Sequence, residues 1–440
     1  MNKILKNIVW LIFDQFFILF LQFIVGVKIA NYYGAEIYGK YSYAVSLVAF
    51  SGIFFEILNS SVIKKYYTEK NFNEIVYSIT FFKNTIAIVL FFIPIILKNF
   101  VKIDYLFFGL LIFICLDNVL LTTTSGIENF FEYKLEARRI VISNNIVKII
   151  SYSLQYICML SNMGIIIIPL VRCIGSFIRA CLLKYQYKKN YISDKKYRKK
   201  LNLSLLLKII NEGKMLWFSF VAFLIYTQMD KIMIKHYLGE KEIGVYTIGV
   251  NLSSILAIII VPIQNSVFPK MLELYNKDYK KYYNFYLKLN AIITYLYLIL
   301  AIISIFVVKK LFKYVYSEEY IPAIMVYLIL TISVFVRANS IFQMGHIVIK
   351  NATKKSFYKT LAGLILNTFL NIVWIPKYGI NGAAMATSLT HLITAICMDY
   401  FINEYREHFF IQMKSFNIFN IFLREEDKNE ICKDNKKFPF

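Results

Sequence analysis

Cysteine and histidine are scarce in this chain, and neither shows the spacing of a metal site. The 440 residues include six cysteines and four histidines, with no C-x-x-C pair. A disulfide framework needs paired cysteines, and a zinc site needs cysteine or histidine ligands a few residues apart. The sequence therefore predicts neither a disulfide scaffold nor a metal centre, and no cofactor is expected.

Acidic residues are also few. The chain has 27 Asp and Glu against 50 Lys and Arg, which gives a formal net charge of +23. A basic excess of this size suggests nucleic acid when it gathers on a soluble domain. However, 58% of the residues are hydrophobic and 17% are aromatic, which is far more than a soluble domain needs to fill its core. The composition is that of an integral membrane protein.

Apolar stretches long enough to cross a membrane recur along the chain. A spanning helix needs roughly 20 mostly apolar residues, and about twelve stretches meet this length. They are 8–27, 41–63, 79–98, 103–125, 140–162, 164–183, 214–235, 243–268, 287–308, 320–343, 357–375 and 378–403. The predicted fold class is an all-α integral membrane protein with about twelve transmembrane helices.

The basic residues gather in the connections that share one side of the membrane with the N-terminus. Cytoplasmic loops carry the excess of Lys and Arg in membrane proteins, so this side is predicted to be cytoplasmic, and both termini with it. The basic side chains then orient the helices and contact anionic lipid headgroups. Nucleic acid is not expected as a partner.

One passage occurs twice. "YYGAEIYGKYSYAVSL" (32–47) returns as "YLGEKEIGVYTIGVNL" (237–252), and a shift of 205 positions pairs Gly34 with Gly239 and Gly39 with Gly244. A basic linker between the copies separates six spans from six, so the halves are predicted to be parallel repeats. In each half the passage is expected to form the outer turn between the first two helices, because glycine commonly ends a helix.

The predicted domain organisation follows from this duplication. It comprises an N-terminal six-helix bundle (1–183), a basic cytoplasmic linker (184–213), a C-terminal six-helix bundle (214–403) and a cytoplasmic tail (404–440).

Three passages carry a family likeness: "HYLGEKEIGVY", "VPIQNSVFPKM" and "YGINGAAMATSLTHL". Together they resemble the polysaccharide exporters of the multidrug/oligosaccharidyl-lipid/polysaccharide superfamily, and within it the O-antigen flippases of the Wzx type. The likeness covers nearly the whole chain through residue 403. The first half departs from the more usual R-Y-L-G-P-E form, since it reads "NYYGAEIYGKY" and has no arginine there.

The resemblance implies a V-shaped, MATE-like pair of six-helix bundles in the bacterial inner membrane. It implies a transporter, not an enzyme, that works by alternating access. The expected cargo is an oligosaccharide linked to a lipid of the undecaprenyl-pyrophosphate type, for O-antigen, lipopolysaccharide, capsule or related surface polysaccharide. Membrane lipids and other polysaccharide assembly proteins are the expected partners.

Two cationic residues lie deep in their predicted spans. Lys148 and Arg172 are each about eight residues from the nearer end of the span, roughly 12 Å along the helix. Charged groups at this depth cost at least about 2.5 kcal/mol, so they face the protein interior or a wet cavity. Polar residues at helical spacing accompany them and extend to a shallower cation, Arg337: Asn144, Ser151 and Gln155 with Lys148, Ser176 with Arg172, and Ser333 and Ser340 with Arg337.

We interpret Lys148, Arg172 and Arg337 as a cationic cavity for the pyrophosphate or acidic sugars of a lipid carrier. Arginine suits this role because its planar fork binds phosphate oxygens in pairs while it remains charged. The alternative is that these residues pair with acidic groups, Asp117, Asp14 or Glu56, and only hold the bundle together. Four shallower charges are predicted to be anchors that reach the membrane interface: Lys83, Arg179, Lys231 and Asp399.

Asp14 and Asp230 are candidates for coupling transport to a proton or sodium gradient. Interhelical hydrogen bonding is the alternative for both. Pro262 falls within the span 243–268, where a missing backbone N–H favours a kink. This kink is a candidate hinge for alternating access, or a static feature of the helix.

The two alternative functions are a multidrug antiporter and a membrane polysaccharide polymerase or ligase. A multidrug antiporter of the same fold is expected to have a cavity dominated by carboxylates, whereas the deepest charges here are cationic. A membrane polysaccharide polymerase or ligase needs a sizeable outer loop for catalysis, and the predicted outer connections are short. The sequence therefore favours the flippase.

Overall fold

The computed structural model describes residues 3–68, 72–192, 200–258, 260–350 and 353–423. At 3–16, 18–20, 261–262, 265–266 and 353 it describes the backbone alone. The described chain is helical throughout, as the sequence predicts. Its first half contains α1 (Lys3–Ala49), α2 (Gly52–Phe55), α3 (Ser60–Ile63), α4 (Phe72–Leu97), α5 (Tyr105–Thr122), α6 (Ser125–Tyr133), α7 (Ala137–Leu160) and α8 (Ile167–Tyr191).

The second half repeats this plan. It contains α9 (Leu203–Leu238), α10 (Glu240–Ala257), α11 (Ile260–Lys277), α12 (Tyr279–Val315), α13 (Ala323–Asn339), α14 (Gln343–Ile349), α15 (Thr353–Tyr378), α16 (Ile380–Leu392), α17 (Met398–Phe401) and α18 (Asn403–Ser415). One π-helical turn, Ile393–Cys397, joins α16 to α17.

Eight helical stretches of the described chain are long and apolar enough to cross a membrane: Leu21–Tyr66, Phe72–Leu97, Tyr105–Thr122, Leu203–Leu238, Tyr279–Val315, Glu318–Ile349, Lys354–Tyr378 and Ile380–Phe401. The predicted spans at 140–162 and 164–183 are also helices, α7 and α8, but several charged residues lower their hydropathy. The predicted span at 243–268 is divided between α10 and α11. The protein is thus a multi-pass integral membrane protein.

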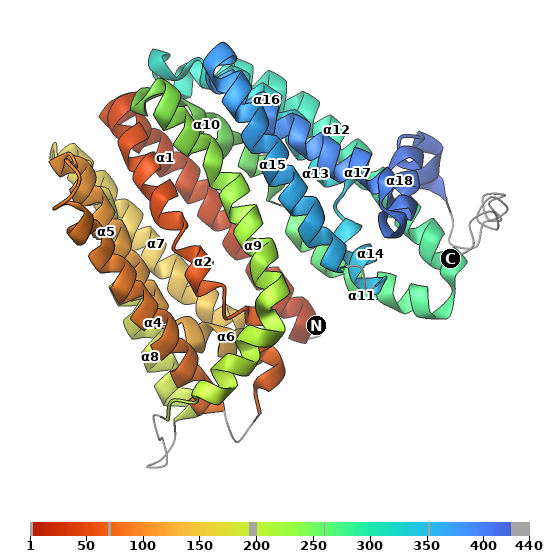
Figure 1. Cartoon of the computed structure of the whole chain (residues 1–440), viewed down its shortest axis with the longest axis horizontal. Helices are drawn as coiled ribbons and strands as arrows, with labels where there is room; N and C mark the ends of the chain where they lie inside the picture. The colour runs from red at the N-terminus through yellow and green to blue at the C-terminus, as the bar shows by residue number, and fades with distance from the viewer. Residues whose placement is uncertain (1–2, 69–71, 193–199, 259, 351–352, 424–440) are drawn as a thin grey trace.

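The helices form two bundles, one from each half of the chain (Figure 1). The bundles meet at one end, where α1 lies against α10, and they spread apart towards the end that carries the N-terminus. We call the end where they meet the closed end. This arrangement confirms the predicted pair of repeated bundles.

Glycine makes the turns at the closed end. Gly34 has φ +75° and Gly239 has φ +97°, and each separates the first helix of its half from the second. A positive φ is strained for residues with a side chain and free of penalty for glycine. The predicted role of the duplicated passage as a turn is therefore confirmed in both halves.

The second pair of duplicated glycines joins the two halves. A Cβ atom at Gly39 would lie 1.8 Å from the carbonyl oxygen of Glu240, and one at Gly244 would lie 2.2 Å from the carbonyl oxygen of Ala35. Backbone meets backbone here with no room for a side chain. Each glycine is thus required by the other half of the molecule, which is a reason for the passage to occur twice.

Asn31 strengthens the closed end by linking the first helix to the end of α12. Its side-chain amide donates to the carbonyl of Val315 at 2.7 Å, and its Oδ1 accepts from the N–H of Ser317 at 3.0 Å. Tyr320 adds a hydrogen bond of 2.9 Å to the carbonyl of Ala30. These contacts connect the two bundles in the conformation described.

Asn31→Ala should therefore loosen the closed end. Each hydrogen bond between exposed neutral groups is worth about 0.5–1.5 kcal/mol, so the closed population should fall roughly tenfold relative to the separated one. Spin labels at the exposed, repeat-equivalent positions Glu36 and Lys241 would report a longer mean distance. Asn99→Ala, in an exposed connection, is the control, and an unchanged distance in Asn31→Ala would contradict the expectation.

The second helix of each half is broken. In the first half α1 ends at Ala49, before the short helices α2 and α3, and in the second half α10 ends at Ala257. Pro262 lies in the first turn of α11, directly after that break. Its missing N–H would have bonded the carbonyl of Ile258, so the proline fits where the helix has already been interrupted.

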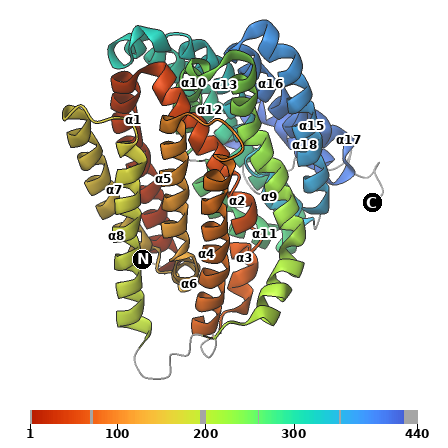
Figure 2. The same cartoon turned by 60° about the vertical axis from the view of Figure 1, so that its left-hand side comes forward.

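Helix α9 belongs to both bundles. Figure 2 shows its lower part beside α2 and α3 of the first bundle. Leu206 and Ile209 are buried in a cluster with residues of that bundle, and the Trp217 indole donates to the carbonyl of Ile53 at 2.7 Å. The upper part packs against α15. Helix thus occupies both ends of the predicted linker, because α8 continues to Tyr191 and α9 begins at Leu203.

The predicted tail begins with an ordered helix, α18, that packs on α12. His408 bonds the hydroxyl of Tyr286, and Ser415 accepts from Asn339 at 3.0 Å. Burial, with His346 and Lys359 nearby, holds the pKa of His408 well below its usual range, so this histidine is neutral. The residues 424–440 of the tail lie outside the described part.

Three of the predicted interfacial anchors are wrong. Lys83 is buried, with 7% of the residue exposed. Arg179 donates to Glu128 at 2.9 Å and to Asn144 at 2.6 Å, with 13% of its side chain exposed. Asp399 is fully buried in an ion pair with Lys359. Arg179 and Asp399 both have partners inside a bundle. The distance of a residue from the end of its helix does not reveal such pairing.

Candidate functional site

Arg172 lies on α8 and is held by two groups from other helices. Its guanidinium donates to Asp117 of α5 at 3.0 Å and to the Tyr41 hydroxyl of α1 at 3.1 Å. Asp117 also accepts from Ser176, one turn further along α8. The structure thus contains the ion pair between Arg172 and Asp117 that was the alternative to ligand binding. Even so, 41% of the Arg172 side chain is exposed. The guanidinium can therefore still reach a ligand.

The polar stripe of α7 faces α8 for most of its length. Gln155 is buried and donates to the carbonyl of Ile168 at 3.4 Å, and Ser151 packs against Gly175, where a Cβ would lie 2.3 Å from its hydroxyl. Asn144 binds Arg179. These residues join two helices instead of lining an open cavity. Lys148, from the same stripe, is half-buried in the middle of α7.

Arg337 differs from the other deep cations. It is exposed, and it lies in the last turn of α13, within the Glu318–Ile349 span. Among the described residues it has no hydrogen-bonded or ion-paired partner. Its nearest charged or titratable neighbours are Tyr226, Tyr297 and His391. An accessible arginine with no ion pair among the described residues is available to an anion.

Asp230 lies in a buried network of neutral donors. Its carboxylate accepts from Tyr246, Asn371 and Thr387, each at 2.7 Å, and 6% of the residue is exposed. No cation of the described chain forms an ion pair with it. A buried carboxylate with only neutral donors keeps the capacity to take up a proton or a metal cation. The other candidate, Asp14, lies on α1, and its side chain is outside the described residues.

The tyrosines at these two sites are equivalent in the repeat. Tyr41 bonds Arg172 in the first half, and Tyr246, 205 positions later, bonds Asp230 in the second. Neither tyrosine was among the predicted site residues. The duplication itself was the signal that could have identified them, since it aligns the two.

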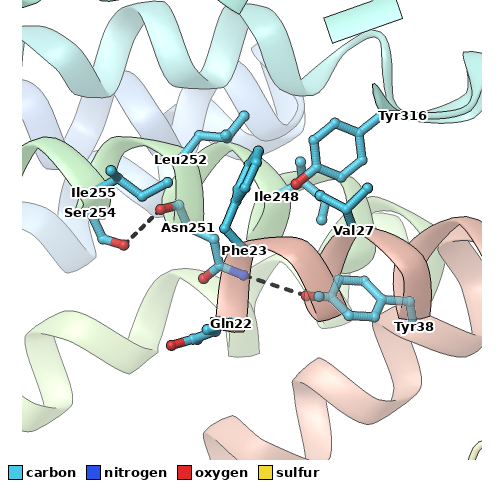
Figure 3. Close-up of a pocket in the computed structure, with 11 residues that line it drawn as sticks. Gln22, Phe23, Val27, Tyr38, Ile248, Asn251, Leu252, Ser254, Ile255 and Tyr316 are labelled. Atoms are coloured by element: carbon cyan, nitrogen blue, oxygen red, sulfur yellow. Dashed lines mark hydrogen bonds between the residues drawn. The ribbon is translucent and has the colours of Figure 1, made fainter. Parts of the chain in front are cut away.

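A cavity lies between the bundles, just below the closed end (Figure 3). Its volume is about 30 Å³, which is room for one or two water molecules. One wall comes from α1, the other from α10, and Tyr316 enters from the end of α12. The sequence did not predict this cavity, because its existence depends on how far two helices diverge after they cross.

The comparisons with known proteins agree with this geometry. Residues 4–275 match the model of a family described as polysaccharide biosynthesis protein. The chain belongs to that family. Curated relatives match about half of the chain, which spans between 38% and 54% of their own length. One is the probable low-salt glycan biosynthesis flippase Agl15 of Haloferax volcanii, 21% identical over 187 residues, which are 41% of this chain and 38% of that protein.

Solved structures with the same fold cover almost the whole chain of this polysaccharide biosynthesis family member. The lipid II flippase MurJ in an inward closed conformation gives a TM-score of 0.65 at 16% identity, covering 97% of this chain and 94% of its own. An inward-facing MATE family multidrug transporter gives 0.66 at 10% identity, with 93% and 96% covered. The fold is that of the multidrug/oligosaccharidyl-lipid/polysaccharide superfamily. The chain thus shares its fold with a lipid flippase and with drug transporters.

Proposed function

We propose that the protein is a flippase for an oligosaccharide linked to a lipid of the undecaprenyl-pyrophosphate type. The observation that carries this proposal is Arg337, an exposed side chain without an ion pair among the described residues, in the last turn of α13 within the Glu318–Ile349 span. A pyrophosphate is the charged part of such a cargo, and arginine binds phosphate oxygens in pairs.

Lys148 and Arg172 extend the proposed binding surface to the first bundle. Arg172 lies half-exposed on α8, and Lys148 lies on the neighbouring α7. Cations on both bundles allow one anionic headgroup to contact both halves. Such a ligand binds more tightly to the conformation in which cations of both bundles contact it. Alternating access requires this difference in affinity between two conformations.

The membrane and the orientation in which the protein would work follow from the predicted topology. We propose the bacterial inner membrane, with both termini cytoplasmic and the closed end facing outwards. We also propose the domain boundaries that the sequence predicts, at residues 183, 213 and 403, with helix extending into both ends of the linker. The cargo then serves O-antigen, capsule, lipopolysaccharide or a related surface polysaccharide, and other polysaccharide assembly proteins would receive it.

The proposed topology can be tested directly. A phosphatase reporter, active only outside the cytoplasm, should be inactive when fused after Phe440 and active when inserted in the loop at Gly164. Reversed activities would contradict the orientation. The expected contrast is at least about tenfold, because the basic connections orient the whole chain.

The break between α10 and α11 supports Pro262 as a hinge. A hinge absorbs rotation at few residues, which are often the last residues of a helix or strand. The corresponding break after α1 lies in the equivalent helix of the first half. We propose that the bundles rock about these two breaks while the closed end opens.

Asp230 is the proposed site of coupling to a proton or sodium gradient, and Asp14 is its counterpart on α1. The oxygens around the Asp230 carboxylate come from Tyr246 and Thr387, so a small cation would find neutral oxygen ligands beside the charge. A coupling ion needs a buried group that changes its charge state, and this carboxylate is buried.

Asp230→Asn should remove that coupling. Asparagine keeps the size of the side chain and one acceptor oxygen but loses the charge, so transport driven by an imposed sodium or proton gradient should fall about tenfold or more, to the rate without a gradient. Proteoliposomes with each gradient in turn would measure this. Glu273→Gln, at an exposed end of α11, is the matched control. A gradient dependence that survives in Asp230→Asn would contradict the role.

The experiment that tests the proposed function is transport by the purified protein. Proteoliposomes carrying fluorescently labelled, lipid-linked oligosaccharide should show time-dependent protection of the label from an external quencher. The multidrug antiporter remains the second candidate because MATE transporters share the fold. Ethidium efflux without lipid-linked saccharide translocation would favour that alternative and overturn the flippase.

A further inference from the structure

Helix α18 turns back into the molecule after the last spanning stretch, which ends at Phe401. It packs on α12 of the second bundle (Figure 1). The hydroxyl of Tyr279, at the start of α12, donates to Glu407, and further along both helices Thr294 and Ser415 share a hydrogen bond of 3.2 Å. The two helices therefore run in the same direction, towards the closed end, where α12 finishes.

The end of α18 lies at the depth of the bilayer core. Residues 289–308 of α12 carry no charge, lie between Lys288 and Lys309, and match the roughly 20 apolar residues that a bilayer core requires. Thr294 is six residues past Lys288, which is about 9 Å along the helix. Ser415, bonded to Thr294, therefore lies inside the core, and the residues that follow it begin at that depth.

The side chain of Lys414 agrees with this depth. Its ammonium donates to the Tyr283 hydroxyl at 3.3 Å and lies over the same ring. Tyr283 is on α12, outside the uncharged stretch and five residues before Lys288. Long cationic side chains point back in this way from a position in the membrane to its interface. Lys414 and Lys288 would then place their charges at the level of anionic headgroups.

A short 3₁₀-helix, η4 (Ile418–Phe422), follows α18 and presents two phenylalanines. Side chains three residues apart share one face of a 3₁₀-helix, so Phe419 and Phe422 project together, and 76% of each residue is exposed. The exposed face of α12 carries apolar residues of the same kind, among them Ile299 and Phe306. Because η4 packs on α12, it adds its phenylalanines to the surface that α12 presents to lipid.

Several backbone groups around η4 are bonded to side chains of the protein. The carbonyl of Phe416 accepts from the Tyr295 hydroxyl at 2.5 Å, and the carbonyl of Lys414 accepts from the Asn420 side chain at 2.7 Å. The side chain of Asn417 accepts from a backbone N–H of η4 at 3.1 Å. Irregular backbone needs such partners inside a membrane, because no water is available there. The segment is therefore equipped to enter lipid.

We propose that residues 403–423 form a re-entrant segment that docks in the lipid leaflet at the end opposite the closed end. Phe419 and Phe422 lie among the acyl chains, and Lys288 and Lys414 lie at the anionic headgroups. An exposed aromatic patch can also bind a protein, but its depth and its position beside the lipid-facing side of α12 favour lipid here. The tail that the sequence predicts to be cytoplasmic is thus embedded in the membrane as far as Leu423.

Spin labels can distinguish lipid, water and protein around η4. The protein would carry one label, in a background without the six native cysteines, in nanodiscs of phosphatidylcholine and phosphatidylglycerol. A label at Phe419→Cys should be relaxed by oxygen and shielded from a water-soluble nickel chelate. Its ratio of oxygen to nickel accessibility should be roughly tenfold higher than at Asn403→Cys, because a segment that lies 5–10 Å deep excludes the chelate.

Matched positions control this comparison. Asn403 and Phe419 are both exposed on the protein, so only the surrounding medium distinguishes them. Phe306→Cys, within the uncharged stretch of α12, is the reference for a lipid-facing label, and Phe422→Cys should behave like Phe419→Cys. A lipid-facing ratio at Phe306→Cys also shows that the labelled protein is folded and inserted.

Two results would overturn the proposal. Nickel accessibility at Phe419→Cys as high as at Asn403→Cys would place η4 in water. Low accessibility to both oxygen and nickel would show that protein, such as a second copy of this chain, covers the phenylalanines. No cargo enters the experiment, so its result is independent of the proposed function.

Discussion

Gly39→Ala is expected to separate the two bundles at the closed end and to reduce transport more than tenfold. The added Cβ would lie 1.8 Å from the Glu240 carbonyl oxygen, a distance that no side-chain rotation relieves, because both atoms are fixed by backbone. The helices α1 and α10 must therefore move apart. The conformation with a closed end is lost, and with it one of the two states between which alternating access operates.

Distances between spin labels at Glu36 and Lys241 would measure this change, in a background without the six native cysteines. The mean distance should increase by several ångströms in Gly39→Ala and by a similar amount in Gly244→Ala. Gly164→Ala is the matched control, because a Cβ there meets nothing within 4 Å. Unaltered distances together with full transport in Gly39→Ala would show that the crossing tolerates a methyl group.

Arg337→Gln is the second variant with a large expected effect. Glutamine keeps a polar side chain of similar reach but removes the charge and the paired donors that a pyrophosphate needs. Charge-assisted hydrogen bonds contribute about 1.5–3 kcal/mol each, so affinity for a pyrophosphate-bearing lipid should fall at least tenfold. Since Arg337 has no ion pair among the described residues, its removal leaves no buried carboxylate unpaired. The amount and thermal stability of the protein should stay the same.

Binding of undecaprenyl pyrophosphate to the purified variants would measure the effect. Arg337→Lys should restore part of the affinity, because lysine returns the charge without the planar fork. Lys310→Gln removes an exposed charge near the end of α12 and serves as the control. A variant Arg337→Gln that unfolds, or one that binds as tightly as the original, would remove Arg337 from the proposed site.

For the deep charged residues, the sequence predicted burial but not the partners. Depth along a helix predicted that Lys148 and Arg172 face the protein and not lipid, and Arg172 does contact groups on two other helices. It could not distinguish their surroundings, since Asp117 lies on another helix, 55 positions away from Arg172 in the chain. The polar stripe of α7 likewise indicated a face but not whether α8 or a cavity lies opposite.

Hydropathy and the duplication by themselves determined that this is a helical membrane protein of two repeated bundles, and that glycines turn each first helix into the second. These features depend on the transfer of apolar residues into lipid and on local backbone freedom, both of which a sequence carries directly. Only the tertiary structure decided that Gly39 and Gly244 fix the crossing and that a neutral cavity lies beneath it. It also decided that Arg172 is paired, while Arg337 has no ion pair within the part of the chain that the structure describes. Each of these depends on which side chains from distant segments meet in space, and that is settled by the packing of both bundles together.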